Sequence, residues 1–307
     1  MRLVKPIFLC FNGPKFHIKD KVEIILFMTA SASVLILFLI IVFVFEEGVP
    51  AFMNMGLSNF LFGQRWAPYY ESFGAFPLLY GSLMIVFGSL VISVPLGIFT
   101  ALFLAEYVPR WLGDLLKPII ELLAAIPSIV YGFFGFVFLA PRIMEFFDLS
   151  VGKTALTASV ILSIMTVPTI VSISSEVISS VPKEYRKASL ALGATKWQTL
   201  KSVVLPTAKP GIVASILLAF GRAIGETVAV LMVCGLVPEI PSPPWNYFEP
   251  VHTLTAAIAL DMGEVPWGSL HYHALFGLGV ILFTITFIVN TVADFIMKKA
   301  PKGAVQI

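Results

Sequence analysis

The chain has 307 residues, of which 58% are hydrophobic and 12% are charged, and its mean hydropathy is +0.94. Soluble domains carry about a quarter charged residues, so this composition excludes an ordinary soluble protein and points to the lipid bilayer. The net charge of +2 is too small to favour nucleic acid as a partner.

Six stretches are long enough to cross a membrane, which takes about 20 apolar residues per helix. They cover residues 24–45, 76–105, 122–140, 154–175, 211–237 and 274–293, and the fifth carries charges within it. The first exceeds the apolar region of a signal peptide and ends without small residues, so we expect an uncleaved first span. All six are too long for the strands of a membrane β-barrel. The sequence therefore predicts an all-α membrane protein with six transmembrane helices.

Lysine and arginine flank these stretches unevenly, and the cytoplasmic loops of membrane proteins are enriched in both residues. With the N-terminus inside, sixteen of them lie on the cytoplasmic side and three, Arg65, Arg142 and Lys153, lie outside. We therefore expect a multi-pass protein whose N- and C-termini are both cytoplasmic. The loop at 176–210 then faces the cytoplasm, and the loop at 238–271 faces outward.

The inner loop carries the signals of two short helices joined by a tight turn. The first helix is predicted to end at Gly193, because glycine favours the left-handed position after a helix. Thr195 and Gln198 then form a capping box for the second helix. We expect Pro206 and Pro210 to interrupt the chain before the fifth span. On periodicity alone, the loop could equally be a connector that rests on the membrane surface.

The spacing from Ala188 and Ser189 to Gly193 and on to Leu205-Pro206 resembles the EAA loop of ABC importer permeases. The resemblance implies a helical knob that docks into a groove on a cytosolic ATPase. The chain departs from the family pattern at Lys187, where glutamate is usual, and at Ser189, where a second alanine is usual. Any specific ion pair from position 187 therefore stays open. The residues so assigned to ATPase coupling are Glu184, Lys187, Ala188, Ser189, Gly193, Leu205 and Pro206.

We expect no ATPase within the chain itself. Gly152-Lys153-Thr154 has the ending of a phosphate-binding P-loop, but that motif needs a glycine where Phe147 stands. His271 and His273 lack a third ligand nearby and do not favour a metal site. The expected role is a transport subunit, not an enzyme, with no cofactor, and a separate partner chain would hydrolyse ATP.

Two charges stand inside the fifth span. Arg222 and Glu226 are one turn apart if the helix is continuous, so both would lie on one face. In one interpretation they neutralise each other and lock helix packing, with Gly221 and Gly225 allowing close contact. In the other, Arg222 donates hydrogen bonds to an anion and Glu226 tunes or gates its path. The order of arginine before glutamate stabilises a helix less well, which favours the anion path.

The third span contains Pro127, which is expected to kink the helix and turn Ser128 and Tyr131 inward. Packing geometry explains this proline equally well. The residues predicted to line the anion pathway are Arg222, Glu226, Thr227, Ser128 and Tyr131.

Four stretches together resemble the phosphate ABC transporter permeases of the Pst system, which are type I importer permeases: residues 73–82, 121–135, 183–206 and 221–232. The run Gly-Glu-Thr-Val-Ala-Val-Leu-Met at 225–232 is more similar to the PstC-type subunit than to its PstA-type partner. The resemblance implies a MetI-like permease core at 76–297. A cytoplasmic N-terminus, the first span and an outer loop would precede it at 1–75, and a cytoplasmic tail would follow at 298–307.

The resemblance also implies function and partners. A PstC-type subunit forms a heterodimer with a PstA-type permease in the plasma (inner) membrane, together with a PstB-type ATPase dimer and an extracytoplasmic PstS-type phosphate-binding protein. The family's span-five arginine and glutamate, implicated in phosphate passage, correspond to Arg222 and Glu226. Two alternatives stay open: the same machine for another oxyanion such as sulfate or molybdate, and an ATP-independent secondary transporter. The 184–206 loop argues against the second.

Overall fold

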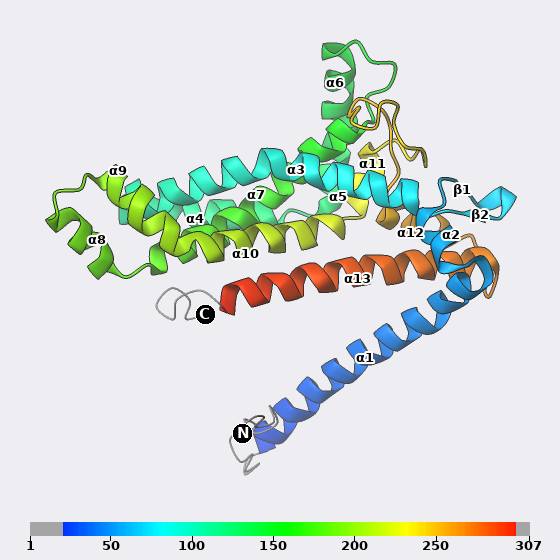
Figure 1. Cartoon of the computed structure of the whole chain (residues 1–307), viewed down its shortest axis with the longest axis horizontal. Helices are drawn as coiled ribbons and strands as arrows, with labels where there is room; N and C mark the ends of the chain where they lie inside the picture. Colours follow the sequence, from blue (N-terminus) through cyan, green and yellow to red (C-terminus); the bar gives the residue numbers. More distant parts are fainter. Residues whose placement is uncertain (1–20, 299–307) are drawn as a thin grey trace, which may run out of the picture. The chain divides into compact units, whose positions relative to one another are not determined.

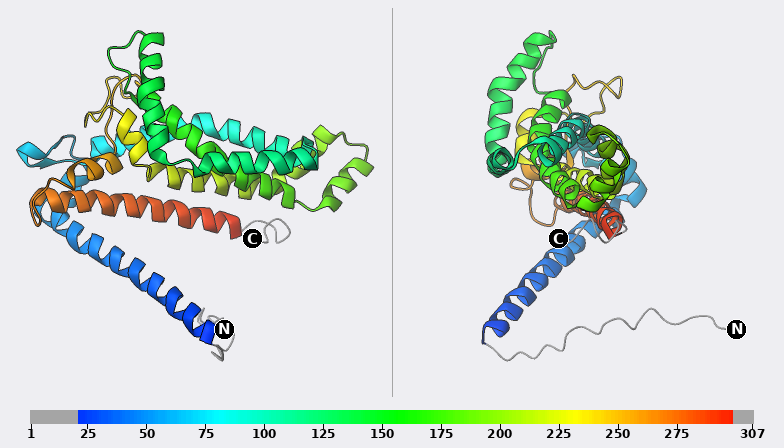
Figure 2. Two further views of the ribbon diagram at one scale, coloured as in Figure 1. Left: turned by 180° about the vertical axis from the view of Figure 1, so that it is seen from behind. Right: turned by 90° about the vertical axis from the view of Figure 1, so that its left-hand side faces the viewer.

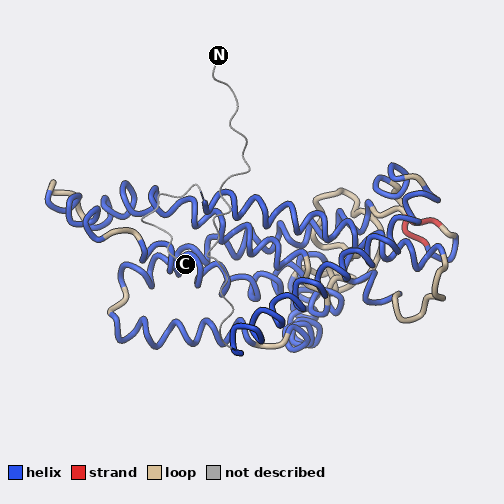
Figure 3. The backbone as a smooth tube through the Cα atoms, turned by 90° about the horizontal axis from the view of Figure 1, so that it is seen from below, coloured by secondary structure: helices blue, strands red, loops and turns tan. Residues whose placement is uncertain are grey.

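The structure is a computed structural model that describes the backbone of residues 21–298. The expected N-terminal segment up to residue 20 and the tail from residue 299 lie outside the described residues. Six helical spans in the described part are long and apolar enough to cross a membrane: Ile24–Met55, Phe76–Tyr107, Ser128–Phe146, Ala155–Ser180, Lys196–Ile224 and Leu270–Met297. The strands β1 (Trp66–Ala67) and β2 (Ser72–Phe73) make one small hairpin (Figure 3). The prediction of an all-α protein with six transmembrane helices is confirmed.

The chain divides into two compact units at Val44. The first unit contains most of α1 (Lys21–Met55). The end of α1 belongs to the second unit, where Ala51 packs with Phe60 of α2 (Leu57–Phe62).

The second unit is built around α3 (Phe76–Leu102), α7 (Ala155–Ser180) and α10 (Leu205–Ile224). These helices run side by side, and α13 (Leu270–Lys298) packs along α10 (Figures 1 and 2). Glycine at the contacts lets the helices approach closely, since Gly97 of α3 meets Ile170 of α7 and Gly211 of α10 meets Val177.

Shorter helices gather at the two ends of this bundle. α8 (Lys183–Ala191) and α9 (Lys196–Thr199) lie beyond one end (Figure 1). At the opposite end lie α6 (Ala140–Phe146), α11 (Val228–Val233) and α12 (Leu254–Asp261).

The fifth span differs from the prediction at its first end. Pro206 and Pro210 do not interrupt it, because α9 continues through the π-helical turn η4 (Leu200–Val204) directly into α10. Pro206 stands in the first turn of α10, after the wide turn of η4, where a proline is tolerated. The expected break before the fifth span is therefore wrong.

At its other end the fifth span stops early. The helix ends at Ile224, with Gly225 as its C-cap, and restarts as α11 at Val228. The prediction of one helix from residue 211 to 237 is wrong, because an apolar run does not distinguish a spanning helix from an interrupted one buried in protein.

The third span is also interrupted, at the expected proline. α4 (Arg110–Ala125) ends before Pro127, and α5 (Ser128–Phe134) begins directly after it. α5 then continues through the π-helical turn η3 (Gly135–Leu139) into α6. The proline separates two helices instead of kinking one, and the span begins at Ser128.

The segment between α11 and α13 folds back onto the bundle. Val251 and Leu254 are fully buried, and Gly235 pairs with Val251 in an isolated parallel bridge. The Ser82 hydroxyl of α3 accepts a hydrogen bond from the Leu254 N–H at 2.9 Å, and α12 packs on α3 and α13. The loop expected at 238–271 thus contains a helix whose first half is buried.

Close packing at Gly81 generates a stability prediction. A Cβ on Gly81 would overlap the carbonyl oxygen of His252, whereas a Cβ on Gly263 would meet nothing within 4 Å. We expect Gly81→Ala to lower the free energy of unfolding by about 1–3 kcal/mol through overpacking. The unfolding midpoint of the purified protein in detergent measures the effect, with Gly263→Ala as the control. Equal midpoints for the two variants would contradict this packing.

Candidate functional site

The interruption of the fifth span separates two charged residues. Arg222 stands in the last turn of α10, and Glu226 lies in the gap before α11. They do not share the face of one helix, so the expected one-turn geometry is wrong. Backbone outside a regular helix is tolerated at membrane depth where it is buried in protein or lines a cavity.

The side chain of Arg222 is exposed on the surface of this chain, and its Nη1 donates to the Thr169 hydroxyl of α7 at 2.8 Å. A guanidinium has five N–H donors in a planar fork, so the contact with Thr169 uses one of them. Exposure of the rest leaves donors for a ligand or a partner chain.

Glu226 contacts a different part of the molecule. Its side-chain Oε1 accepts a hydrogen bond from the N–H of Ala229, in the first turn of α11, at 3.3 Å. Its backbone carbonyl oxygen accepts one from the Thr255 hydroxyl at 2.9 Å. It lines a cavity of about 10 Å³ together with Ser82 and Thr255. No ion pair among the described residues joins Glu226 to Arg222. The structure therefore shows no neutralised pair at this position.

The other predicted pathway residues lie at two breaks: Ser128 and Tyr131 follow the interruption between α4 and α5, and Thr227 lies in the gap between α10 and α11. Tyr131 is buried, and its hydroxyl donates to the Leu123 carbonyl oxygen across the α4–α5 interruption at 2.8 Å. Thr227 is half-buried and donates to the Gly225 carbonyl oxygen at 3.2 Å. Ser128 is half-buried at the start of α5.

Helix packing brings part of this set together. α5 and α11 pack closely where a Cβ on Gly132 would lie 3.0 Å from the Cα of Ala229, and Tyr131 packs in the same cluster as Ala229. The hydroxyls of Tyr131 and Thr227 are already bonded to backbone carbonyls. Arg222 is therefore the pathway candidate with the most donor capacity left.

Thr169 was missed by the sequence reasoning. A hydroxyl in an apolar stretch is a weak signal, because threonine commonly bonds to its own helix. Only the packing of α10 on α7 identifies it as a partner of Arg222.

A larger polar cavity, of about 490 Å³, lies between α4 and α7 towards the end of the bundle that carries α8. Its polar lining comprises Lys117, Glu121, Ser172, Ser175, Glu176, Ser179 and Ser180. The α7 residues among these follow Thr169 along the helix at intervals of about one turn. A polar face on a transmembrane helix is costly against lipid, so it indicates a protein partner or water.

The turn between α8 and α9 has the predicted geometry. Gly193 has a φ of +86°, in the left-handed region. The Thr195 hydroxyl accepts from the Gln198 N–H at 3.2 Å, and the Gln198 side chain accepts from the Thr195 N–H at 2.8 Å. The two-helix knob and its capping box are confirmed.

The tip of this knob presents apolar side chains to solvent. Leu192 is 90% exposed and Trp197 is 58% exposed, next to the open space at Gly193. Among the predicted coupling residues, Glu184, Lys187, Ala188 and Pro206 are exposed, whereas Ser189 and Leu205 are half-buried. The Ser189 and Thr199 hydroxyls lie 2.9 Å apart and join the two helices. Apolar groups exposed beside charged ones are typical of a docking surface.

The two histidines near the start of α13 each have a carboxylate neighbour. His271 lies 3.2 Å from Asp261, and His273 lies 3.3 Å from Glu47. Within residues 21–298, no group of three or more histidine, cysteine, aspartate or glutamate side chains could hold a metal ion.

Six spans, an interrupted span with an exposed arginine and a projecting helical knob define a membrane transport subunit. Residues 93–301 match the family described as "Binding-protein-dependent transport system inner membrane component". The chain belongs to this family.

Its relatives include the probable ABC transporter permease protein YqgH of Bacillus subtilis, which is 37% identical over 88% of each chain. The phosphate transport system permease protein PstC of Pasteurella multocida is 36% identical, over 82% of this chain and 83% of that protein. PstC of Mesorhizobium japonicum is 35% identical over 78% of each. A solved structure of the methionine ABC transporter MetNI in an inward-facing conformation covers 75% of this chain and 95% of its own, with a TM-score of 0.54 and 19% identity. That likeness shows a shared fold.

Proposed function

We propose that the chain is the permease subunit of an ATP-driven importer of inorganic phosphate. The observation that carries this proposal is the exposed guanidinium of Arg222 at the end of α10, bonded to Thr169 with further donors available. Its planar fork suits the oxygens of a tetrahedral oxyanion, which it can bind in a bidentate manner. The polar face of α7 beyond Thr169 supports a solute route along this helix.

Phosphate is favoured over sulfate and molybdate by two considerations. Two of the relatives described above are named as phosphate permeases. In addition, the carboxylate of Glu226 accepts hydrogen bonds, which a protonated phosphate can donate and fully ionised sulfate cannot. Thr227, Ser128 and Tyr131 would line the same region, mainly by shaping the two helix interruptions.

The knob formed by α8 and α9 is the proposed docking site for a separate ATPase dimer. Its exposed apolar tip and the resemblance to the EAA loop support this role, with Glu184, Lys187, Ala188 and Gly193 at the contact. We place the knob in the cytoplasm, with both termini on the same side, from the distribution of lysine and arginine. A second, related permease and an extracytoplasmic phosphate-binding protein complete the importer.

In this account, ATP binding brings the two ATPases together, and the knobs pass that movement to the spans. The site then opens outward and receives phosphate from the binding protein. When the site returns from its outward-open to its inward-open state, phosphate is released into the cytoplasm. Residues 76–297 form the permease core in this proposal.

If the knob docks on an ATPase, a large side chain at position 193 should weaken ATPase binding and phosphate uptake. The Cβ position of Gly193 opens onto empty space, so Gly193→Leu would not clash within the chain, but it strains the left-handed backbone and obstructs a partner. We expect an inserted protein that retains less ATPase on purification and loses ATP-driven uptake. Gly193→Asn is the matched control, because asparagine tolerates this conformation. Full ATPase retention and normal uptake by Gly193→Leu would refute docking at this turn.

The anion role predicts a specific defect at Arg222. Losing one charge-assisted hydrogen bond to phosphate costs about 1.5–3 kcal/mol, or roughly a ten- to hundredfold loss of uptake. Arg222→Gln should assemble normally, since the residue is exposed, and Arg222→Lys should keep part of the activity. Arg142→Gln, also at an exposed arginine, is the control. The measurement is radiolabelled phosphate uptake, normalised to assembled complex.

A double variant separates the two interpretations of the charges. If Arg222 only neutralised Glu226, replacing both by glutamine would restore transport, because no unpaired charge would remain. We expect the double variant to assemble and still fail to transport. Near-normal uptake would contradict the anion role.

A further inference from the structure

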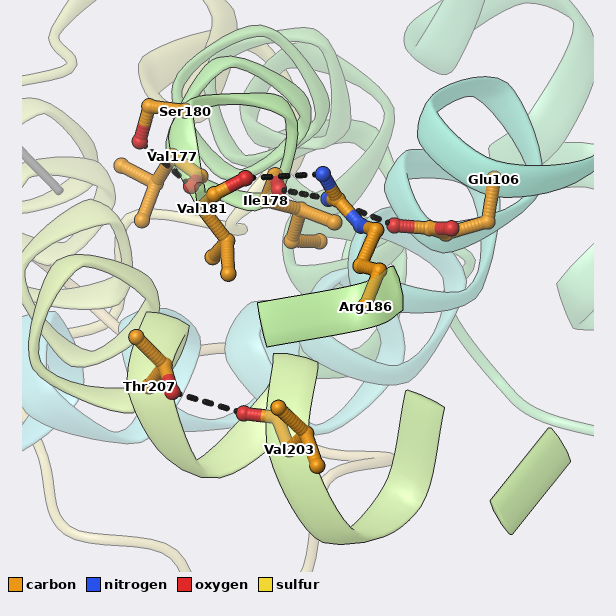
Figure 4. A network of polar contacts seen from close by, with 8 residues as sticks. All are labelled: Glu106, Val177, Ile178, Ser180, Val181, Arg186, Val203 and Thr207. Atoms are coloured by element: carbon orange, nitrogen blue, oxygen red, sulfur yellow. Dashed lines mark hydrogen bonds and ion pairs between the residues drawn. The ribbon is translucent and has the colours of Figure 1, made fainter. Parts of the chain in front are cut away.

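One guanidinium ties the helical knob to two spans of the bundle. Arg186 of α8 donates from Nη1 to the Val181 carbonyl oxygen at 2.8 Å. Its Nη2 donates to the Ile178 carbonyl oxygen and to the Glu106 carboxylate, each at 2.8 Å. Figure 4 shows these contacts converging on the one side chain.

The three acceptors come from two elements, the end of α7 and the turn η2 (Phe103–Tyr107). Ile178 and Val181 lie at the C-terminal end of α7, where helix carbonyls lack partners within the helix and carry partial negative charge. Glu106 lies in η2, the π-helical turn that ends the second span. The guanidinium therefore donates both to the free carbonyl oxygens at the end of the fourth span and to the Glu106 carboxylate at the end of the second span.

This contact is not an ordinary surface ion pair. The side chains of Arg186 and Glu106 are only 19% and 21% exposed. They line a pocket of about 140 Å³ bounded by η2, α8, α9 and η4. Two π-helical turns, which often occur at functional sites, thus flank the same guanidinium.

The knob has two mechanical connections to the bundle. α9 passes through η4 into α10 as one helix, so the fifth span is joined to the knob covalently. α8 is joined covalently to α7 by the short turn at Val181 and Pro182. The three hydrogen bonds of Arg186 oppose rotation of α8 about this turn, in addition to the Ser189–Thr199 contact with α9.

We propose that Arg186 is a positioning residue that makes the knob move together with the second and fourth spans, with Glu106 as its essential partner. The inference rests on the proposed function, since the docked ATPase supplies the movement. Lysine cannot replace arginine here, because one ammonium lacks the planar fork that reaches the three acceptors. If Arg186 served only to cap α7, the charge on Glu106 would be dispensable.

The test uses the complex purified with its ATPase. Glu106→Gln removes the charge but keeps an acceptor and both carbonyl contacts, Arg186→Lys removes the fork, and Lys183→Gln changes an exposed residue of α8 as the control. We expect both test variants to retain ATPase and basal ATP hydrolysis, while phosphate transported per ATP falls by about tenfold. The control should match the wild type. The double variant should be no worse than the more severe single variant, because both changes break one contact.

A second measurement needs no transported substrate. Spin labels at Lys183→Cys in α8 and Phe103→Cys in η2 report the separation of the knob and the second span. The chain has two cysteines of its own: Cys10 is replaced by serine so that it takes no label, and Cys234 is buried. We expect ATP to leave this separation unchanged in the wild type and to shift or broaden it in Glu106→Gln.

Three results would overturn the proposal: normal transport per ATP in both test variants, an unchanged label separation in Glu106→Gln, or failure of that mild variant to assemble. The last would show that the pair only holds the fold. Failure of the proposed function is distinct, because the wild type would then copurify without an ATPase or take up no phosphate.

Discussion

Backbone groups inside a bilayer find no water, so an interrupted transmembrane helix must satisfy its free N–H and C=O groups within the protein. In this chain, hydroxyl side chains do so. Tyr131 donates across the break at Pro127, and Thr227 and Thr255 donate to carbonyl oxygens around the break after Ile224. The carboxylate of Glu226 accepts from the new helix α11. The two helix interruptions lie close together, because α5, which follows the first, packs against α11, which follows the second.

This constraint connects the proposed anion site with the proposed docking knob. Because the groups at the break are satisfied locally, Arg222 is left with free donors at the end of α10. The same helix extends without interruption to η4 and α9, in the knob. A movement of the knob along this helix reaches the residue proposed to bind phosphate, and the Arg186 contact carries the movement to the neighbouring spans.

Local features of the fold were predictable from the sequence. Span number follows from apolar length, and the knob follows from a glycine and a capping box whose partners are within three residues. The break at Gly225 was not predictable, because residues 228–237 are as apolar as a spanning helix. Pro206 was misjudged, since its tolerance depends on the π-helical turn before it.

Contacts between segments that are distant in the sequence could not be predicted either. Arg186 and Glu106 are 80 residues apart, and Arg222 and Thr169 are 53 apart, so packing alone brings each pair together. The expectation that Arg222 and Glu226 share one helix face rested on a helix that is not continuous. Sequence spacing gives contacts only within an element whose continuity is already known.

The central claim is that this subunit couples ATP hydrolysis to phosphate import. Its most direct test is the purified complex in liposomes that contain ATP, with the phosphate-binding protein and radiolabelled phosphate outside. We expect phosphate to accumulate inside above its outer concentration. A non-hydrolysable ATP analogue should abolish this accumulation, and excess sulfate should not compete. Equal phosphate uptake with and without ATP would contradict coupling to ATP hydrolysis and indicate a secondary transporter.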